Sequence, residues 1–125
     1  MKFTVEKGER FVVIEPHVTC LDGEVADKLK GEFMLLNTGG QRNIVLDINQ
    51  VRSADEDGLR AGLLARRLCK SVGGLFILVN VHEDVFSYLK TVRLESYFKM
   101  ADDVEGAKDM IFGNELRLDL RGEEE

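Results

Sequence analysis

The chain has 125 residues, of which 44% are hydrophobic, so it is long enough to bury one core without disulfides or metals. It has 17 Lys and Arg and 23 Asp and Glu residues, which give a formal net charge of -6. Because the basic residues do not cluster along the sequence, this balance argues against nucleic acid and anionic membranes as partners. No stretch reaches the roughly 18 apolar residues of a membrane helix, and residues 1–6 do not resemble a signal peptide, so a cytoplasmic protein is expected.

The first half of the chain predicts a hairpin, a helix and a buried strand. Apolar alternation over residues 2–6 and 10–15 is typical of two hairpin strands. Residues 25–36 have apolar side chains at helical spacing and predict an amphipathic helix. The short apolar run at residues 44–48 predicts a strand that is covered on both faces.

The second half continues the alternation of helices and strands. Helical spacing returns at residues 59–72, and residues 75–79 predict a second buried strand. Shorter helices are predicted at residues 83–90 and 103–111, with a last short strand between them at residues 97–100. Strand-helix-strand crossovers place their strands in parallel, so the sequence predicts an α/β domain with a mixed sheet.

The C-terminal residues have a different pattern. Residues 115–121 alternate leucine with charged residues at every position, which predicts an added edge strand. We therefore divide the chain into a domain at residues 1–113 and an extension at residues 114–125 that ends in an acidic tail. A homodimer formed by strand addition through Leu116, Leu118 and Leu120 is one alternative function of this extension.

Three acidic residues at the start of the second helix are the main candidates for a functional site. Asp55, Glu56 and Asp57 follow the buried strand and its loop, and the free amides and dipole of a helix N-terminus favour negative charge. Asp55 can serve as the N-cap, a role worth about 1 kcal/mol. Since only one residue is the cap, the surplus charge of Asp57 predicts an interaction surface, a divalent metal site or a fixed negative group.

The order of elements and this segment together resemble the STAS domains of sulphate transporters and anti-sigma factor antagonists. The resemblance covers residues 9–112. In that family a strand ends in Asp, a short turn follows, and Asp-Ser-Ser-Gly-Leu opens a helix; here residues 55–59 read Asp-Glu-Asp-Gly-Leu. The resemblance implies a single STAS-like domain, a mixed sheet of four to five strands and helices packed mainly on one face.

The resemblance also implies a function. In the bacterial members the second serine of the motif is phosphorylated by an anti-sigma factor that is also a kinase, and phosphorylation releases that partner. Asp57 stands at that serine and Glu56 at its neighbour. We therefore expect a non-enzymatic regulator, without cofactor or metal, that binds a kinase-type anti-sigma factor. Asp57 either imitates the phosphorylated state permanently or meets a partner adapted with Lys or Arg, and we favour the second hypothesis.

The helix after the motif suggests how a partner would dock. A helical projection turns Leu59, Leu63, Arg66, Arg67 and Lys70 away from the sheet, whereas Ala61, Leu64, Ala65, Leu68 and Val72 face it. The predicted partner-binding residues are Asp55, Glu56, Asp57, Gly58, Leu59, Gly62, Leu63 and Arg66. In the alternative, Leu59 and Leu63 pack against a neighbouring helix of the same domain.

Further candidates are weaker. Ser53 is an alternative phosphorylation site beside the motif, and Cys20 and Cys69 are expected to be buried free thiols. Asp55, Glu56 and Asp57 are also considered as a magnesium site at the end of a strand. A nucleotide- or small-ligand-sensing module of a stress-signalling complex is the alternative that keeps the fold and changes the role.

Overall fold

The computed structural model describes residues 2–124 and has a mixed sheet of five strands in the order β1-β2-β4-β6-β7. The first two strands form an antiparallel hairpin, and the other strands run parallel to β2. The strands are β1 (Phe3–Gly8), β2 (Phe11–Pro16), β4 (Ile44–Asp47), β6 (Phe76–Val79) and β7 (Lys99–Ala101). The predicted α/β domain with a mixed sheet is therefore confirmed.

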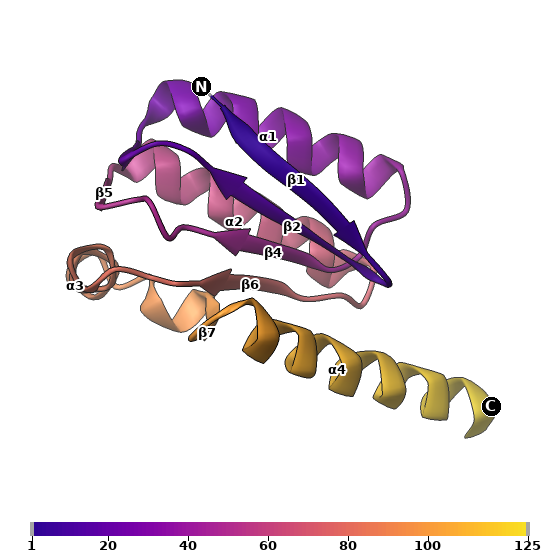
Figure 1. The fold of residues 1–125 in the computed structure, drawn as a ribbon. Coiled ribbons are helices and arrows are strands. Elements are labelled where there is room, and N and C mark those ends of the chain that lie inside the picture. Colours follow the sequence, from indigo (N-terminus) through magenta and orange to yellow (C-terminus); the bar gives the residue numbers. More distant parts are fainter. Residues whose placement is uncertain (1, 125) are drawn as a thin grey trace.

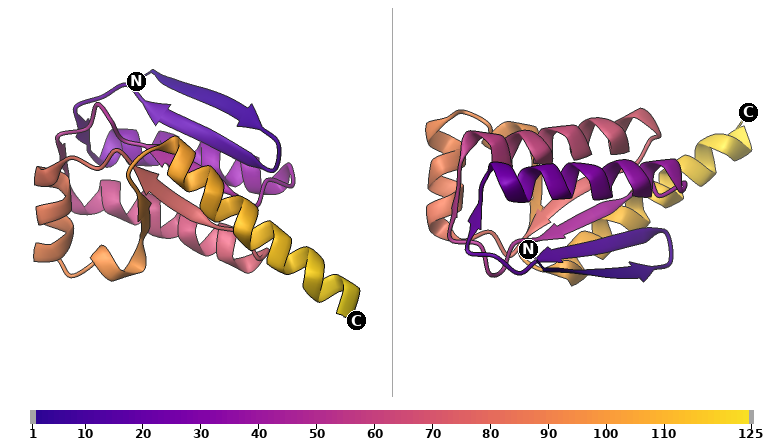
Figure 2. Two further views of the ribbon diagram at one scale, coloured as in Figure 1. Left: turned by 60° about the horizontal axis from the view of Figure 1, so that its bottom comes forward. Right: turned by 90° about the horizontal axis from the view of Figure 1, so that it is seen from above.

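Helices cover both faces of this sheet. Two long helices lie side by side on one face and a third crosses the opposite face (Figure 2), while α3 lies beyond the ends of the parallel strands (Figure 1). The helices are α1 (Gly23–Thr38), α2 (Glu56–Ser71), α3 (Glu83–Thr91), the 3-10 turn η1 (Glu95–Tyr97) and α4 (Val104–Glu124). None of the helices within residues 2–124 is long and apolar enough to cross a membrane.

The alternation of side chains along each strand divides the core between the two faces. Val12 and Ile14 of β2 belong to the cluster that includes the buried faces of α1 and α2. Phe11 and Val13 of the same strand belong to a second cluster, which includes Ile111 of α4. The strand at residues 44–48 is accordingly buried from both sides, as its uninterrupted apolar run predicts.

The prediction of an edge strand at residues 115–121 is wrong, because these residues continue α4. Ala107, Ile111, Asn114 and Glu115 recur at helical spacing and are all buried against the sheet. The predicted boundary between residues 113 and 114 thus falls inside one helix, and Leu116 and Leu120 lie on its exposed side. A homodimer built by strand addition at this segment loses its structural basis.

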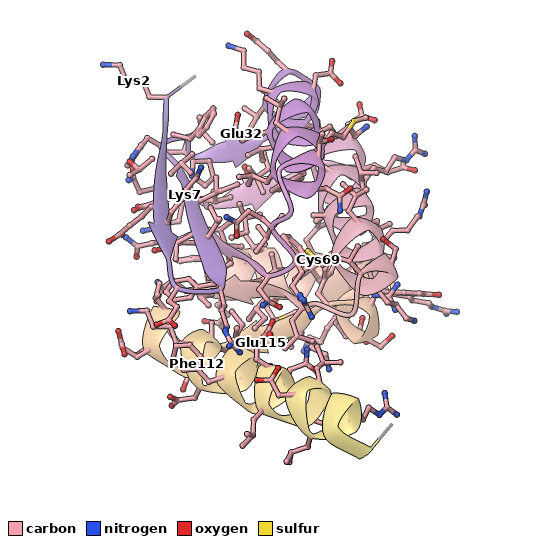
Figure 3. The ribbon with its side chains drawn as sticks, turned by 90° about the vertical axis from the view of Figure 1, so that its right-hand side faces the viewer. Lys2, Lys7, Glu32, Cys69, Phe112 and Glu115 are labelled. Carbon is pink, nitrogen blue, oxygen red and sulfur yellow. The ribbon has the colours of Figure 1, made fainter. Side chains whose placement is uncertain are left out.

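A buried polar network, which no pattern in the sequence predicts, connects α4 to the sheet. Asn43, which is completely buried, donates through Nδ2 to the carbonyl of Arg10 at 2.8 Å and to Oε1 of Glu115 at 2.7 Å. Its Oδ1 accepts from the backbone amide of Leu75 at 2.9 Å. Glu115 points from α4 toward the sheet (Figure 3) and also lies 3.7 Å from the Arg42 guanidinium. These bonds hold three strands and the long helix in one arrangement.

Candidate functional site

Two very short strands bring the beginnings of α1 and α2 together. β3 (Cys20–Leu21) precedes α1 and pairs in parallel with β5 (Ser53–Ala54), which precedes α2. The amide of Asp55 continues this pairing by donating to the carbonyl of Leu21 at 3.0 Å. The loop that carries the acidic residues is therefore held against the neighbouring loop, and the two helices start side by side.

Asp55 and Gly58 fix the first turn of α2. Asp55 has an extended backbone, and its Oδ1 accepts from the amide of Gly58 at 2.9 Å, which confirms the predicted N-cap. Gly58 is buried against β3, where a Cβ would lie only 2.1 Å from the carbonyl oxygen of Leu21. Only glycine permits this close approach, so Gly58 positions the acidic residues, and it is buried where the sequence predicts a partner contact.

Glu56 and Asp57 are open to solvent, with side-chain exposures of 73% and 63%. The carboxylate of Glu56 accepts from Nη2 of Arg60 at 2.6 Å, whereas Asp57 is 3.9 Å from Nη1 of the same residue. Asp57 also lies beside the start of α1, since its Oδ2 is 3.2 Å from the place that a Cβ on Gly23 would take. Two carboxylates, those of Glu56 and Asp57, therefore share one guanidinium, that of Arg60. The sequence analysis left Arg60 out, although its spacing from Glu56 signals the pair.

The same geometry argues against the magnesium alternative. Asp55 turns to the amide of Gly58, Glu56 turns to Arg60, and Asp57 lies toward Gly23, so the three carboxylates do not converge on a point. Across residues 2–124 no group of three His, Cys, Asp or Glu side chains is arranged to hold a metal ion. The acidic residues present an outward-facing charged surface.

The prediction that Leu59 turns away from the sheet to contact a partner is wrong. Leu59 is 6% exposed and lies with Val85 and Leu89 of α3 in the core. Gly62 is also buried, and a Cβ there would lie 3.0 Å from the ring of Phe98. A projection of α2 alone shows one buried stripe, but α3 and Phe98 cover a second side of the helix. The alternative in which Leu59 packs against a neighbouring helix is the one observed.

The remaining predicted positions on α2 divide between surface and core. Leu63 and Arg66 are half-buried and remain available to a partner. Val72, expected to face the sheet, is 47% exposed because the helix ends at Ser71, and Cys69 occupies the buried position instead. Ser53 is exposed in β5, and its phosphorylation stays a prediction.

Both cysteines are free, as expected, but their surroundings differ. Cys20 is only half-buried in β3, whereas Cys69 is buried between α2 and the sheet. Burial raises the pKa of the Cys69 thiol to about 12, against the lowering effect of a hydrogen bond with the backbone of Ile44. Cys69 is therefore a protonated, structural thiol at neutral pH.

Comparison with known proteins assigns this architecture to a family. The family model of the STAS domain matches residues 2–107, and the chain belongs to this family. It is 27% identical over 111 residues to the "Putative anti-sigma factor antagonist BtrV" of Bordetella bronchiseptica, covering 86% of this chain and 91% of that protein. The chain is thus an anti-sigma factor antagonist-like STAS protein, a class whose members are generally non-enzymatic regulators.

Solved structures agree with this assignment. A "putative anti-sigma factor antagonist" from Thermotoga maritima superposes with a TM-score of 0.79 at 25% identity, over 87% of this chain and 93% of that one. The anti-sigma factor antagonist SpoIIAA in its unphosphorylated form gives a TM-score of 0.70 at 22% identity, over 90% of this chain and 99% of that one. The second likeness supports the fold alone.

Proposed function

We propose that this chain binds a kinase-type anti-sigma factor through the exposed surface at the amino end of α2. The observation that carries the proposal is the placement of Asp55, Glu56 and Asp57: all three are exposed at the capped start of α2. The relative from Bordetella bronchiseptica and the structure from Thermotoga maritima both bear the name of putative anti-sigma factor antagonists. The recognition surface comprises these acids with Leu63 and Arg66.

Asp57 determines how such binding would be regulated. On this proposal Asp57 stands where the family motif has its phosphoacceptor serine, and a carboxylate is not a substrate for a serine kinase. A carboxylate carries one negative charge, whereas a phosphoserine carries about 1.5 to 2 at neutral pH, so Asp57 imitates the phosphorylated state only in part. Binding is therefore either permanently weakened or independent of phosphorylation.

We favour a partner adapted to the acids. Exposed ion pairs such as those of Arg60 contribute little to stability, so most of the charge of the three carboxylates remains available to a second molecule. A Lys or Arg of the anti-sigma factor, dehydrated in the interface beside Asp57, gains more than it would at an open surface. On this proposal the association is constitutive and its regulation lies elsewhere.

The substitution Asp57→Ser tests this proposal in calorimetric titrations against the cognate anti-sigma factor. We expect affinity to fall at least tenfold, equivalent to about 1.4 kcal/mol, because the partner's cation loses its counter-charge. Asp109→Ser is the matched control: Asp109 is exposed on α4, far along the chain from the site, and its loss should leave affinity unchanged.

Two results would contradict the adapted-partner hypothesis. Tighter binding by Asp57→Ser, with phosphorylation of the new serine when ATP is added, would mean that Asp57 imitates the phosphorylated state. Equal affinities of Asp57→Ser and the unsubstituted chain would mean that Asp57 lies outside the interface.

A further inference from the structure

A second surface lies on the carboxyl half of α2 and adjoins the recognition surface, because Leu63 and Arg66 border both. A depression of about 630 Å³ is lined by three cations and three apolar or aromatic side chains, namely Arg66, Arg67, Lys70, Leu63, Leu94 and Tyr97. A smaller neighbouring depression shares Arg66, Lys70 and Tyr97 and adds Lys99 of β7. We call Arg66, Arg67, Lys70 and Lys99 the basic cluster.

The fold creates this cluster from distant parts of the sequence. The expectation that basic residues do not cluster is wrong here, because β7 brings Lys99 beside α2. Within residues 2–124, no ion pair of the structure includes a member of the basic cluster. Four cations without a carboxylate partner there, in a chain of net charge -6, form a patch of the opposite sign to the rest of the protein.

The helix dipole does not account for the whole cluster. Lys70 lies in the last turn of α2 and benefits from the dipole. Arg66 lies a turn earlier, and its guanidinium stands 5.5 Å from the centroid of the Tyr97 ring, which is itself 49% exposed. This contact holds the guanidinium on an open aromatic surface. An exposed ring and oriented cations together are features of a binding surface.

We propose that the basic cluster binds a short, carboxylate-rich segment of a partner protein. The depression is open to solvent, unlike the enclosed pockets that hold small ligands. Its lining combines cations with Leu63, Leu94 and Tyr97, which suits a peptide with both acidic and apolar side chains. The acidic amino end of the same helix disfavours a long polyanion such as nucleic acid. The inference goes beyond the proposed function, because it depends neither on Asp57 nor on a kinase.

Fluorescence anisotropy with a designed probe tests the proposal on the full chain. The probe is a fluorescein-labelled peptide of about twelve residues rich in glutamate and leucine, and its partner probe replaces every glutamate with glutamine. We expect Arg67→Glu/Lys70→Glu to weaken binding of the glutamate peptide at least tenfold, and the glutamine peptide not to bind. Both substituted side chains are exposed, so the fold should be retained, which circular dichroism checks.

The control is Lys7→Glu/Lys28→Glu, which makes the same change in net charge at exposed positions of β1 and α1; its affinity should stay within about twofold of the unsubstituted chain. Equal weakening by the two double variants, or no binding of the glutamate peptide at all, would overturn the proposal. Competition by ATP, pyrophosphate or a DNA oligonucleotide at concentrations below that of the free peptide would also overturn it, by assigning the cluster to a phosphate ligand.

Discussion

Gly58→Ala is expected to lower the free energy of unfolding by about 3 kcal/mol, the upper part of the range for overpacked sites. The new methyl group would lie 2.1 Å from the carbonyl oxygen of Leu21, a backbone atom that cannot turn aside. Relief requires α2 to move away from β3, which strains the bond between the Asp55 amide and the same carbonyl. Urea denaturation measures the loss.

Gly31→Ala is the matched control for this substitution. Gly31 lies inside α1, and apart from the backbone of its own helix and its chain neighbours no atom lies within 4 Å of the place that a Cβ would take. Alanine there should raise the free energy of unfolding by roughly 0.5–1 kcal/mol, because it reduces the entropy of the unfolded chain. If Gly58→Ala costs less than about 1 kcal/mol relative to the unsubstituted chain, the contact between α2 and β3 is not as tight as described.

Asn43→Ala is expected to have a comparable effect, about 3 kcal/mol, for a different reason. Removal of the amide leaves the Arg10 carbonyl, the Leu75 amide and Oε1 of Glu115 without the partner that satisfies them inside the protein. Each buried polar group left in this way costs about 1–3 kcal/mol, and entry of water recovers part of the total. Thermal unfolding of the variant should show the loss directly.

Asn49→Ala provides the comparison, because Asn49 is exposed in the loop after β4. This substitution should change the free energy of unfolding by less than about 0.5 kcal/mol. Glu115→Gln adds a second check: an amide at this position retains a hydrogen bond to Asn43 but loses the attraction to Arg10 and Arg42. If Asn43→Ala unfolds no more easily than Asn49→Ala, the polar network does not hold α4 in place.

The sheet and most helices could be predicted because their apolar patterns are long and regular. The C-terminal segment could not, since the leucines at positions 116, 118 and 120 recur at every second residue, which is the spacing of a strand and not of a helix. The deciding facts are tertiary: Asn114 and Glu115 are buried, and Glu115 meets Asn43, which is 72 positions away. A local pattern contains no information about such a partner.

Part of the candidate site could likewise be predicted from the sequence, and part depends on tertiary contacts. The exposure of the acidic residues and the cap formed by Asp55 follow from local helix physics, and the sequence predicts the cap. The burial of Leu59 and Gly62 depends on α3 and Phe98, which a projection of one helix does not include. The pairing of β3 with β5 involves two residues on each side, too few to produce a recognisable alternation.

The most direct test of the recognition surface maps the contact on the intact complex. Isotope-labelled protein is mixed with the unlabelled cognate anti-sigma factor, and the perturbed backbone amides are assigned by nuclear magnetic resonance. We predict that the largest changes fall within residues 53–66, around the exposed carboxylates. Changes confined to β1 or to the exposed side of α4, with residues 53–66 unaffected, would contradict the proposal that the amino end of α2 is the recognition surface.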